Sequence, residues 1–470
     1  MAELLAQVGV SLCELLEDAQ FMGGQFAPVT SCTSDWRQVL PGDIYVALVT
    51  ADGDGHDFAS EAVEQGASAV VAERALPLFG VPQCIVENSQ TAFGQICQAL
   101  VGNPCDRLQV VGIAGTSGKS SVACLFEAIL KTAGACPGAV GTLGCSDGYA
   151  SMRPFVNTPA APTLAHWLSR MDANGCTHGV LEFSSQGLAE GRVAGLGLSV
   201  ACVTNLQRSG EYQHGTMENY RRTMQRIFDG LDSRGVAVLN ADDPVCCRML
   251  AELDSPVMTF GMRQPADVTA QIIEQFVGEQ TILISHGTAS VAVRSRILGA
   301  HHVENCLAAA AIGLASGVDL ATIARGLESV SRIPGRMDRV ECGQGYAIWI
   351  DAADTPERLR ASLQAIRGVV QGRIICAVGP VANSKQKCSA LKQILEQLAD
   401  ISVVHEQTSH PLADRIATAA WALRRARPGD AVLLAANPKL VGGDYHESER
   451  ELIEQMLTGD FYEEFQKHAA

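Results

Sequence analysis

The sequence predicts an α/β protein of three domains, with a parallel sheet in the central domain and a Rossmann-like fold in the last. The chain has 470 residues, which is more than one ordinary hydrophobic core accommodates. Short apolar segments with strand character alternate with segments of helical spacing along its whole length. Turn-forming residues interrupt this alternation at 102–104 and 333–335. The domains are therefore placed at 1–106, 107–333 and 334–470.

Each domain contains its own set of expected elements. Strands are expected at 43–49, 68–72 and 83–87, at 179–183, 199–204 and 235–239, and at 373–378, 401–404 and 431–436. Helices are expected at 58–65, 385–398 and 412–425. The last domain lacks a GxGxxG turn, so its Rossmann-like alternation does not imply a dinucleotide.

The composition excludes several classes of function. Acidic residues outnumber basic ones 51 to 35, and the net charge of -16 argues against a nucleic-acid partner, whose phosphates are neutralised by Lys and Arg. No apolar run reaches the roughly 18 residues of a membrane span, and the first residues lack a secretory pattern. The 16 cysteines show no paired metal-binding spacing, so we expect reduced thiols in a cytoplasmic protein without a membrane partner.

A glycine-rich turn is the strongest functional signal. It follows the apolar run 108–114 and precedes a segment, ended by Gly134, whose apolar residues share one helical face. A strand, a glycine turn and a helix start together form a phosphate cradle, in which Lys119 would hold the terminal phosphates and Ser120 would bind Mg²⁺. The spacing departs from the strict phosphate-loop pattern, because Ile113 stands five residues before Gly118. The expected nucleotide-binding residues are Gly115, Thr116, Ser117, Gly118, Lys119, Ser120 and Ser121.

Further short motifs stand on both sides of this turn. In order they are 34–37, 41–43, 55–58, 157–159, 182–185, 191–193, 204–206, 214–217, 240–244 and 334–337. With the turn, they make the chain resemble the Mur ligase family, of the MurE type, over nearly its whole length. So many motifs in order are far more specific than a single loop.

The resemblance implies a reaction. In Mur ligases of this type, ATP phosphorylates the carboxylate of a UDP-N-acetylmuramoyl peptide, and the amino group of an amino acid then attacks the acyl phosphate. Lys119 and Glu182 are the expected catalytic residues, and Ser120 and Glu182 the expected Mg²⁺ ligands. Glu182 also follows an apolar strand, where an ionised Glu is rarely buried unless it is paired or bound to a metal.

The resemblance implies the other site residues as well. Arg336 and Asp351 are expected to contribute to the nucleotide site. The expected substrate-binding residues are Ser34, Asp35, Asn157, Thr158, Pro159, Ser184, Ser185, Arg192 and His214. Arg192 could instead form a salt bridge on the surface, and His214 could be an ordinary loop histidine; both alternatives stay open.

Several residues of the family are replaced in this chain. Gly210 stands where the family has a metal-binding His, and Met224 stands where it has a carbamylated lysine. Gln186 replaces a second His, and His302 replaces an Asn that touches the base. Met224 is interpreted as core packing, because a thioether suits Mg²⁺ poorly. The pair His301 and His302 is interpreted as interdomain polar packing rather than a metal site.

The last domain departs from the family pattern in four segments. The altered segments are 351–356, 379–385, 407–411 and 436–440. With the replaced metal ligands, these changes affect the second metal site and the capture of the incoming amino acid. One hypothesis is that Glu211 or His214 replaces a lost ligand.

Two interpretations of the function stay open. The chain could be an ATP-dependent ligase with an unusual amino-acid site. It could instead be a non-catalytic homologue that binds nucleotide or UDP-muramoyl peptide, beside a true Mur ligase as partner. A folylpolyglutamate synthetase is disfavoured, because that related class lacks an opening domain like residues 1–106.

Overall fold

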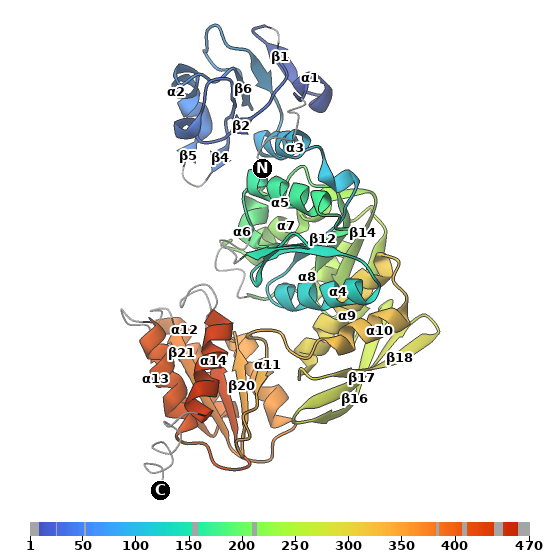
Figure 1. Ribbon diagram of the computed structural model, residues 1–470, viewed down its shortest axis with the longest axis vertical. Coiled ribbons are helices and arrows are strands. Elements are labelled where there is room, and N and C mark those ends of the chain that lie inside the picture. Colours follow the sequence, from blue (N-terminus) through green and yellow to red (C-terminus); the bar gives the residue numbers. More distant parts are fainter. Residues whose placement is uncertain are drawn as a thin grey trace. The chain divides into compact units, whose positions relative to one another are not determined.

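Figure 1 shows the computed structural model of the chain. It describes residues 9–24, 26–50, 53–152, 158–208, 214–381, 385–406, 411–436 and 445–458. By its internal contacts the chain divides into two compact units. The first comprises Met1–Ser117, Ala135–Val238 and Arg248–Val257, and the second comprises Gly118–Gly134, Leu239–Cys247 and Met258–Ala470.

The first unit begins with a small sheet between helices. Its strands run in the order β1 (Gln20–Met22), β7 (Gln83–Ile85), β6 (Ala69–Ala72), β3 (Ile44–Val46) and β2 (Cys32–Thr33). Only β1 is antiparallel to its neighbour. Ile44 and Val46 share a core with α1 (Leu12–Leu15) and α3 (Ser89–Leu100), whereas Tyr45 packs with α2 (Ala59–Glu64). This alternation follows from the two-residue period of a strand.

The second sheet of this unit carries the predicted site. It is part of an eleven-stranded sheet, whose first seven strands in spatial order are β11 (Ser151–Met152), β10 (Gly144–Ser146), β9 (Pro137–Gly141), β12 (His178–Phe183), β8 (Gln109–Ala114), β13 (Leu198–Val203) and β14 (Leu231–Asn240). Strands β9, β12, β8 and β13 are parallel, so their carboxyl ends meet at one edge. Helices α5 (Ala161–Ala173), α6 (Ser185–Ala189) and α7 (Met217–Gln225) also belong to this unit.

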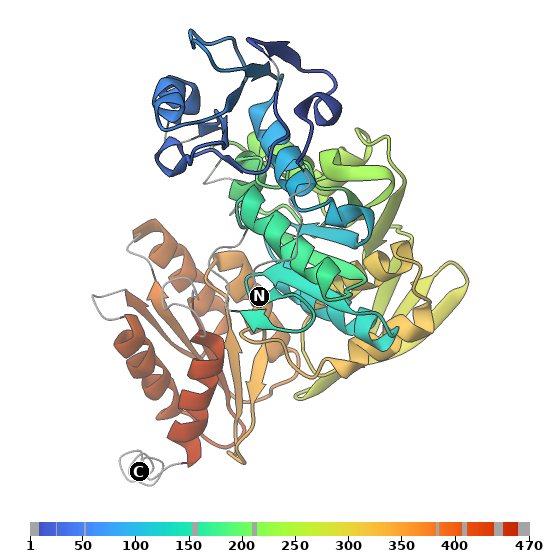
Figure 2. The same ribbon diagram turned by 45° about the horizontal axis from the view of Figure 1, so that its top comes forward.

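The second unit combines an antiparallel ribbon with packed helices. Strands β16 (Val268–Phe276), β17 (Glu279–His286) and β18 (Ala289–Ser295) form the ribbon as two antiparallel hairpins. Strand β15 (Val257–Gly261) pairs with β16 in parallel. Figures 1 and 2 show this ribbon beside α9 (Ala300–Ala315) and α10 (Leu320–Ser329), with α4 (Lys119–Thr132) packed against both helices. Gly134 follows α4 with a positive φ of 79°, which suits the end of a helix.

The end of the chain forms a doubly wound sheet. Its strands run in the order β19 (Asp338–Val340), β20 (Ala347–Asp351), β23 (Ala431–Ala435), β21 (Ile374–Val381) and β22 (Ile401–Glu406). All neighbours are parallel except β19 and β20. Helices α13 (Pro411–Leu423) and α14 (Tyr445–Thr458) pack on one face, and α11 (Pro356–Arg367) and α12 (Lys385–Leu398) complete the fold (Figure 1). The predicted Rossmann-like alternation is thus confirmed.

The predicted elements are present with shifted ends. The strand expected at 43–49 ends at Val46, because Val49 and Thr50 pair with Gly53 and Asp54 in a separate ribbon (β4 and β5). The strand expected at 235–239 already begins at Leu231. The three sheets fall within the three predicted domains, whose boundaries at 106/107 and 333/334 stay a prediction. Among the described residues, no helix is long and apolar enough to cross a bilayer.

A substitution at the contact between α4 and α10 tests the packing of the second unit. A Cβ placed on Gly326 would lie 2.5 Å from the Cα atom of Ile129, so Gly326→Ala must separate the two helices. We expect a loss of about 1–3 kcal/mol from overpacking, reduced by at most about 1 kcal/mol of helix propensity. The matched control is Gly313→Ala in α9, whose new Cβ would meet side-chain carbons alone, those of Ile323 at 3.1 Å and of Ile129 at 3.6 Å. The urea midpoints of unfolding of the two variants measure their losses of stability. Equal midpoints would contradict the close packing of α4 against α10.

Candidate nucleotide and substrate site

The predicted phosphate loop connects β8 to α4, as its spacing indicates. Gly115 has a φ of 145°, and a Cβ there would lie 2.0 Å from Thr204 Oγ1. Gly118 has a φ of 87°, and its Cβ would lie 2.3 Å from Asn305 Oδ1 on α9. Both positions combine a backbone conformation that side chains rarely adopt with a close neighbour. The two glycines are therefore required by geometry.

The segment after β13 holds the loop from one side. The N–H of Thr116 donates to the carbonyl of Asn205 at 2.9 Å, and the N–H of Ser117 donates to Asn205 Oδ1 at 3.1 Å. The Asn205 amide returns a hydrogen bond to the Ser117 carbonyl at 3.1 Å, and the Thr204 hydroxyl donates to the same carbonyl at 2.6 Å. The loop thus has a defined shape before any ligand binds, which is the preorganisation that anion binding needs.

A tyrosine distant in sequence also reaches the loop. The Thr116 hydroxyl accepts from the N–H of Gln207 at 2.8 Å and lies 2.8 Å from the Tyr220 hydroxyl. Tyr220 lies on α7 and is 2% exposed. No sequence motif contained Tyr220, so its place beside the loop was not predicted.

The first turn of α4 contains the remaining loop residues. Lys119, Ser120 and Ser121 begin this helix, and both serines are buried. The positive end of the helix macrodipole lies at these residues and favours an anion. The predicted strand, loop and helix context is therefore confirmed, while the binding roles stay a prediction.

Glu182 lies at the same edge of the sheet as the loop. It pairs in register with Ile113 of β8, next to the start of the loop, and is only 4% exposed. Its two carboxylate oxygens accept from the N–H of Thr142 at 3.2 Å and from the Thr142 hydroxyl at 3.3 Å. A carboxylate so buried needs partners or a cation. Thr142 is a second residue that sequence reasoning missed, because no motif contained it.

Three predicted substrate residues gather around Glu182. The Thr158 hydroxyl lies 3.3 Å from the Glu182 carbonyl and accepts from the N–H of Ser184 at 2.8 Å. Ser184 caps α6 by accepting from the N–H of Gly187 at 3.0 Å. Arg192 donates to the Thr158 carbonyl at 2.9 Å. This polar cluster joins the carboxyl end of β12 to the start of α6.

The other predicted substrate residues differ in burial and in their contacts. Arg192 also donates to Glu190 at 2.6 Å, so the salt bridge considered as its alternative role is present. Pro159 is buried beside Thr158, Ser185 begins α6, and Asn157 lies outside the described residues. The His214 ring stacks on Tyr220 with centroids 5.2 Å apart, and burial lowers the pKa of His214.

Ser34 and Asp35 lie in the small sheet domain, at the start of a 3₁₀ turn (Trp36–Gln38). Asp35 caps this turn by accepting from the backbone N–H of Arg37 at 3.1 Å and from its side chain at 3.0 Å. The Trp36 ring stacks on Phe58, with centroids 5.9 Å apart. The structure thus explains Asp35 as a cap and leaves its substrate role a prediction.

The second unit contains a buried histidine, His302, next to the half-buried His301. His302 is 3% exposed, and its Nε2 lies 3.5 Å from Cys306 Sγ. Burial, with a smaller contribution from His301, lowers the pKa of His302 to about 3, and burial also lowers the pKa of His301. Asp351 ends β20 and accepts from the Ser362 hydroxyl. Within the part of the chain that is described, no cluster of three or more metal-ligating side chains occurs.

The structure bears on the predicted role of Met224 but not on that of Arg336. Arg336 donates to the Gly335 carbonyl at 3.0 Å, with no bearing on its predicted nucleotide role. Met224 is fully buried in α7, which confirms it as core packing. Gly210 and Glu211 lie outside the described residues, as do most of the altered segments 407–411 and 436–440.

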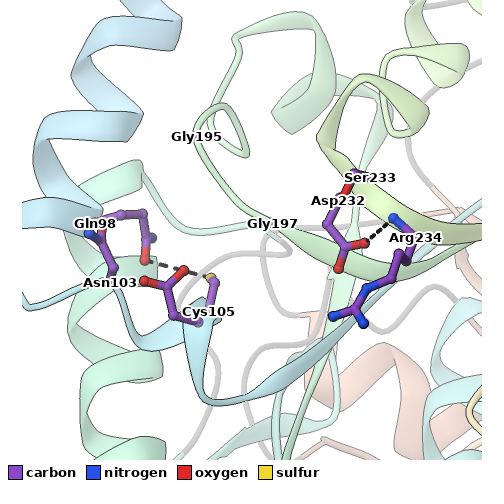
Figure 3. A pocket seen from close by; sticks show the side chains of 9 residues that line it. Gln98, Asn103, Cys105, Gly195, Gly197, Asp232, Ser233 and Arg234 are labelled. Atoms are coloured by element: carbon purple, nitrogen blue, oxygen red, sulfur yellow. Dashed lines mark hydrogen bonds between the residues drawn. The ribbon is translucent and has the colours of Figure 1, made fainter. Parts of the chain in front are cut away.

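A surface cleft is lined by a different set of residues (Figure 3). It has a volume of about 310 Å³. Its lining residues are Gln98, Asn103, Cys105, Asp106, Gly195, Gly197, Asp232, Ser233 and Arg234. None of the sequence-predicted site residues is among them, so the cleft is not assigned to the candidate site.

Comparison with known families agrees with this geometry. Residues 113–313 match the Mur ligase middle domain, and residues 335–437 match the Mur ligase, glutamate ligase domain. The chain therefore belongs to the Mur ligase family. Its fold is the three-domain α/β fold of that family, as predicted.

Curated relatives narrow the similarity to one type of Mur ligase. The chain is 32% identical over 437 residues to a UDP-N-acetylmuramoyl-L-alanyl-D-glutamate--2,6-diaminopimelate ligase of Geobacillus thermodenitrificans, covering 87% of this chain and 89% of the relative. It is also 32% identical over 478 residues to the ligase of the same name from Chlorobaculum tepidum, covering 92% and 93%. The predicted resemblance to the MurE type is thus confirmed.

Solved structures share the fold. A structure of a UDP-N-acetylmuramoyl-L-alanyl-D-glutamate--2,6-diaminopimelate ligase superimposes with a TM-score of 0.71 at 23% identity, covering 92% of this chain and 94% of the other. The MurF ligase of Thermotoga maritima in complex with ADP superimposes with a TM-score of 0.59 at 20% identity, covering 94% and 99%.

The buried His302 predicts an acid-sensitive fold. Because its pKa is about 3 in the folded chain and near 6.5 when unfolded, the unfolded chain binds the extra proton between these values. Stability is therefore lost as the pH falls below 6.5. Relative to His302→Asn, the wild type should lose about 1.4 kcal/mol between pH 7.5 and 5.5. Urea unfolding at both pH values measures this difference.

The control for this prediction is His166→Asn, since His166 is exposed on α5 and its surroundings change little on unfolding. If the free energy of unfolding changes equally with pH in the wild type and in His302→Asn, His302 is not a buried neutral imidazole.

Proposed function

We propose that this chain is an ATP-dependent ligase of peptidoglycan precursor synthesis, which joins an amino acid to a UDP-N-acetylmuramoyl peptide through an acyl phosphate. The main support for this proposal is the position of two groups at one edge of the sheet. The preshaped phosphate loop follows β8, and the buried Glu182 carboxylate lies at the end of β12, the neighbouring parallel strand. Ligands of open parallel sheets bind at this carboxyl edge. The names of the curated relatives support the same substrate class.

The donor set around Glu182 suits a magnesium ion. Glu182 is buried beside Thr142, and its carboxylate oxygens are the hard ligands that Mg²⁺ prefers. We assign Glu182 and Ser120 as its ligands. When bound, Mg²⁺ would offset negative charge on the phosphates.

The residues of the chain have separable roles in this proposal. The loop amides and the positive end of α4 orient the triphosphate, and the Lys119 ammonium stabilises charge on its β- and γ-phosphates. A carboxylate oxygen of the muramoyl peptide attacks the γ-phosphorus, and ADP leaves. The amine of the amino acid then attacks the acyl carbon, and phosphate leaves. Alignment of the reactants by the protein supplies much of the acceleration.

The remaining predicted residues are proposed as binding groups. Arg336 and Asp351 would complete the nucleotide site. Ser34 and Asp35 would bind the uridine end. Asn157, Thr158, Pro159, Ser184, Ser185, Arg192 and His214 would contact the muramoyl peptide. We further propose domain limits at 1–106, 107–333 and 334–470, and a cytoplasmic location.

A second candidate function rests on Met224. Its thioether is fully buried, and it occupies the position where the family resemblance places a carbamylated lysine. A chain that binds ATP and UDP-muramoyl peptide without joining an amino acid, beside a true Mur ligase, fits this replacement. The two candidates differ in turnover and not in binding.

Phosphate release separates the candidates. Full-length protein is incubated with Mg²⁺, ATP, UDP-muramoyl dipeptide and single amino acids, after calorimetry has measured the binding of ATP and dipeptide. Release that depends on one amino acid supports the ligase, and binding without release supports the second candidate. If neither ligand binds, both candidates are wrong.

Lys119→Ala tests the role of the loop lysine. Loss of its ammonium should lower kcat/KM by at least about a hundredfold, because charge develops on the phosphoryl group in the transition state. The matched control is Lys131→Ala in the same helix, whose ammonium lies 3.7 Å from Glu127 and is 64% exposed. Equal kcat/KM values for both variants would remove Lys119 from the mechanism.

A further inference from the structure

The Thr116 side chain is held by protein groups. Its hydroxyl accepts from the N–H of Gln207 and shares a second hydrogen bond with Tyr220, each at 2.8 Å. A threonine hydroxyl has one proton and two lone pairs, so these contacts use much of its capacity. Thr116 therefore serves to fix the loop.

Tyr220 is itself held rigidly. It lies within α7, whose N-cap is Thr216, and its ring stacks on His214. The next residue, Arg221, is 6% exposed. It pairs with Glu218 of the same helix at 2.8 Å and ties the helix to Glu252 at 3.0 Å. The Tyr220 hydroxyl is thus presented from a helix that is anchored through Glu252, which limits its movement.

The Tyr220 contact adds a second attachment to the loop. Asn205 holds the backbone of residues 116 and 117, and it lies close in sequence to Gln207. Tyr220 reaches the same loop from a separate helix, 104 residues after Thr116. A loop held from two elements loses less freedom when it binds a ligand.

We propose that Tyr220 is a positioning residue for ATP, whose hydroxyl holds Thr116 and keeps the phosphate loop in its binding shape. This inference rests on the proposed binding of ATP at the loop. Tyr220 contacts the loop and not the reacting atoms, so it contributes to nucleotide affinity. It gives α7 a role in binding that is independent of position 224.

The test is a double-mutant cycle read by calorimetric titration of the full-length protein with ATP and MgCl2. Tyr220→Phe and Thr116→Val should each weaken ATP binding by about five- to tenfold, the range of one hydrogen bond. Because both remove the same contact, the double variant should be within about twofold of the weaker single variant. Hydrogen exchange of residues 114–121 without ATP should be faster in Tyr220→Phe.

The matched control is Tyr45→Phe. The Tyr45 hydroxyl is also buried and donates to the Gly55 carbonyl at 2.8 Å, in the small sheet domain. This variant should lower the thermal midpoint as Tyr220→Phe does but leave the dissociation constant of ATP unchanged. If Tyr220→Phe does not fold, Thr116→Val and its exchange pattern decide.

Two results would overturn the inference while the proposed function stands. One is a Tyr220→Phe variant that binds ATP within twofold of the wild type and exchanges at the same rate. The other is a double variant whose loss is the product of the single losses. A wild type that binds no ATP would instead refute the proposed function, and the inference with it.

Discussion

The close approach between Gly115 and Thr204 is the constraint on which the candidate site depends. The N–H of Thr204 donates to the Ala114 carbonyl at 2.9 Å, so the pairing of β8 and β13 continues to the first residue of the loop. The next residue must turn where a Cβ would lie 2.0 Å from the Thr204 hydroxyl, and only glycine can do so. Beyond Gly115, hydrogen bonds fix the conformation of residues 116 and 117. Asn205 accepts from the N–H groups of both residues, and the N–H of Gln207 donates to the Thr116 hydroxyl.

The same sheet edge explains the surroundings of Glu182. Parallel pairing places Phe183 opposite Ala114, so the residues after β12 meet those after β8. Thr142 follows β9 on the other side and donates two hydrogen bonds to the carboxylate. A buried carboxylate without them would be costly to desolvate. Thr142 therefore has a structural reason to be present, whether or not a cation binds.

The sequence predicted those features that leave a periodic pattern of apolar residues or a short local motif. The apolar run before Gly115 and the helical spacing after it identified β8 and α4, because burial of one face imposes a period. Glu182 was expected to be buried since its strand is apolar, and it is. Thr142 and Tyr220 were missed, because their hydrogen bonds join residues far apart in the sequence and leave no periodic signal. The Arg192 salt bridge could not be chosen over a substrate contact, since both use the same guanidinium.

Helix α7 shows how binding and chemistry can be separated within one element. Tyr220 and Met224 are four residues apart and therefore share a face, and both are buried. The first supports the phosphate loop through its hydroxyl. The second offers only a thioether, a poor ligand for Mg²⁺. Retained motifs around the loop are therefore evidence for nucleotide binding, and the question of ligation depends on the residues that face the incoming amino acid.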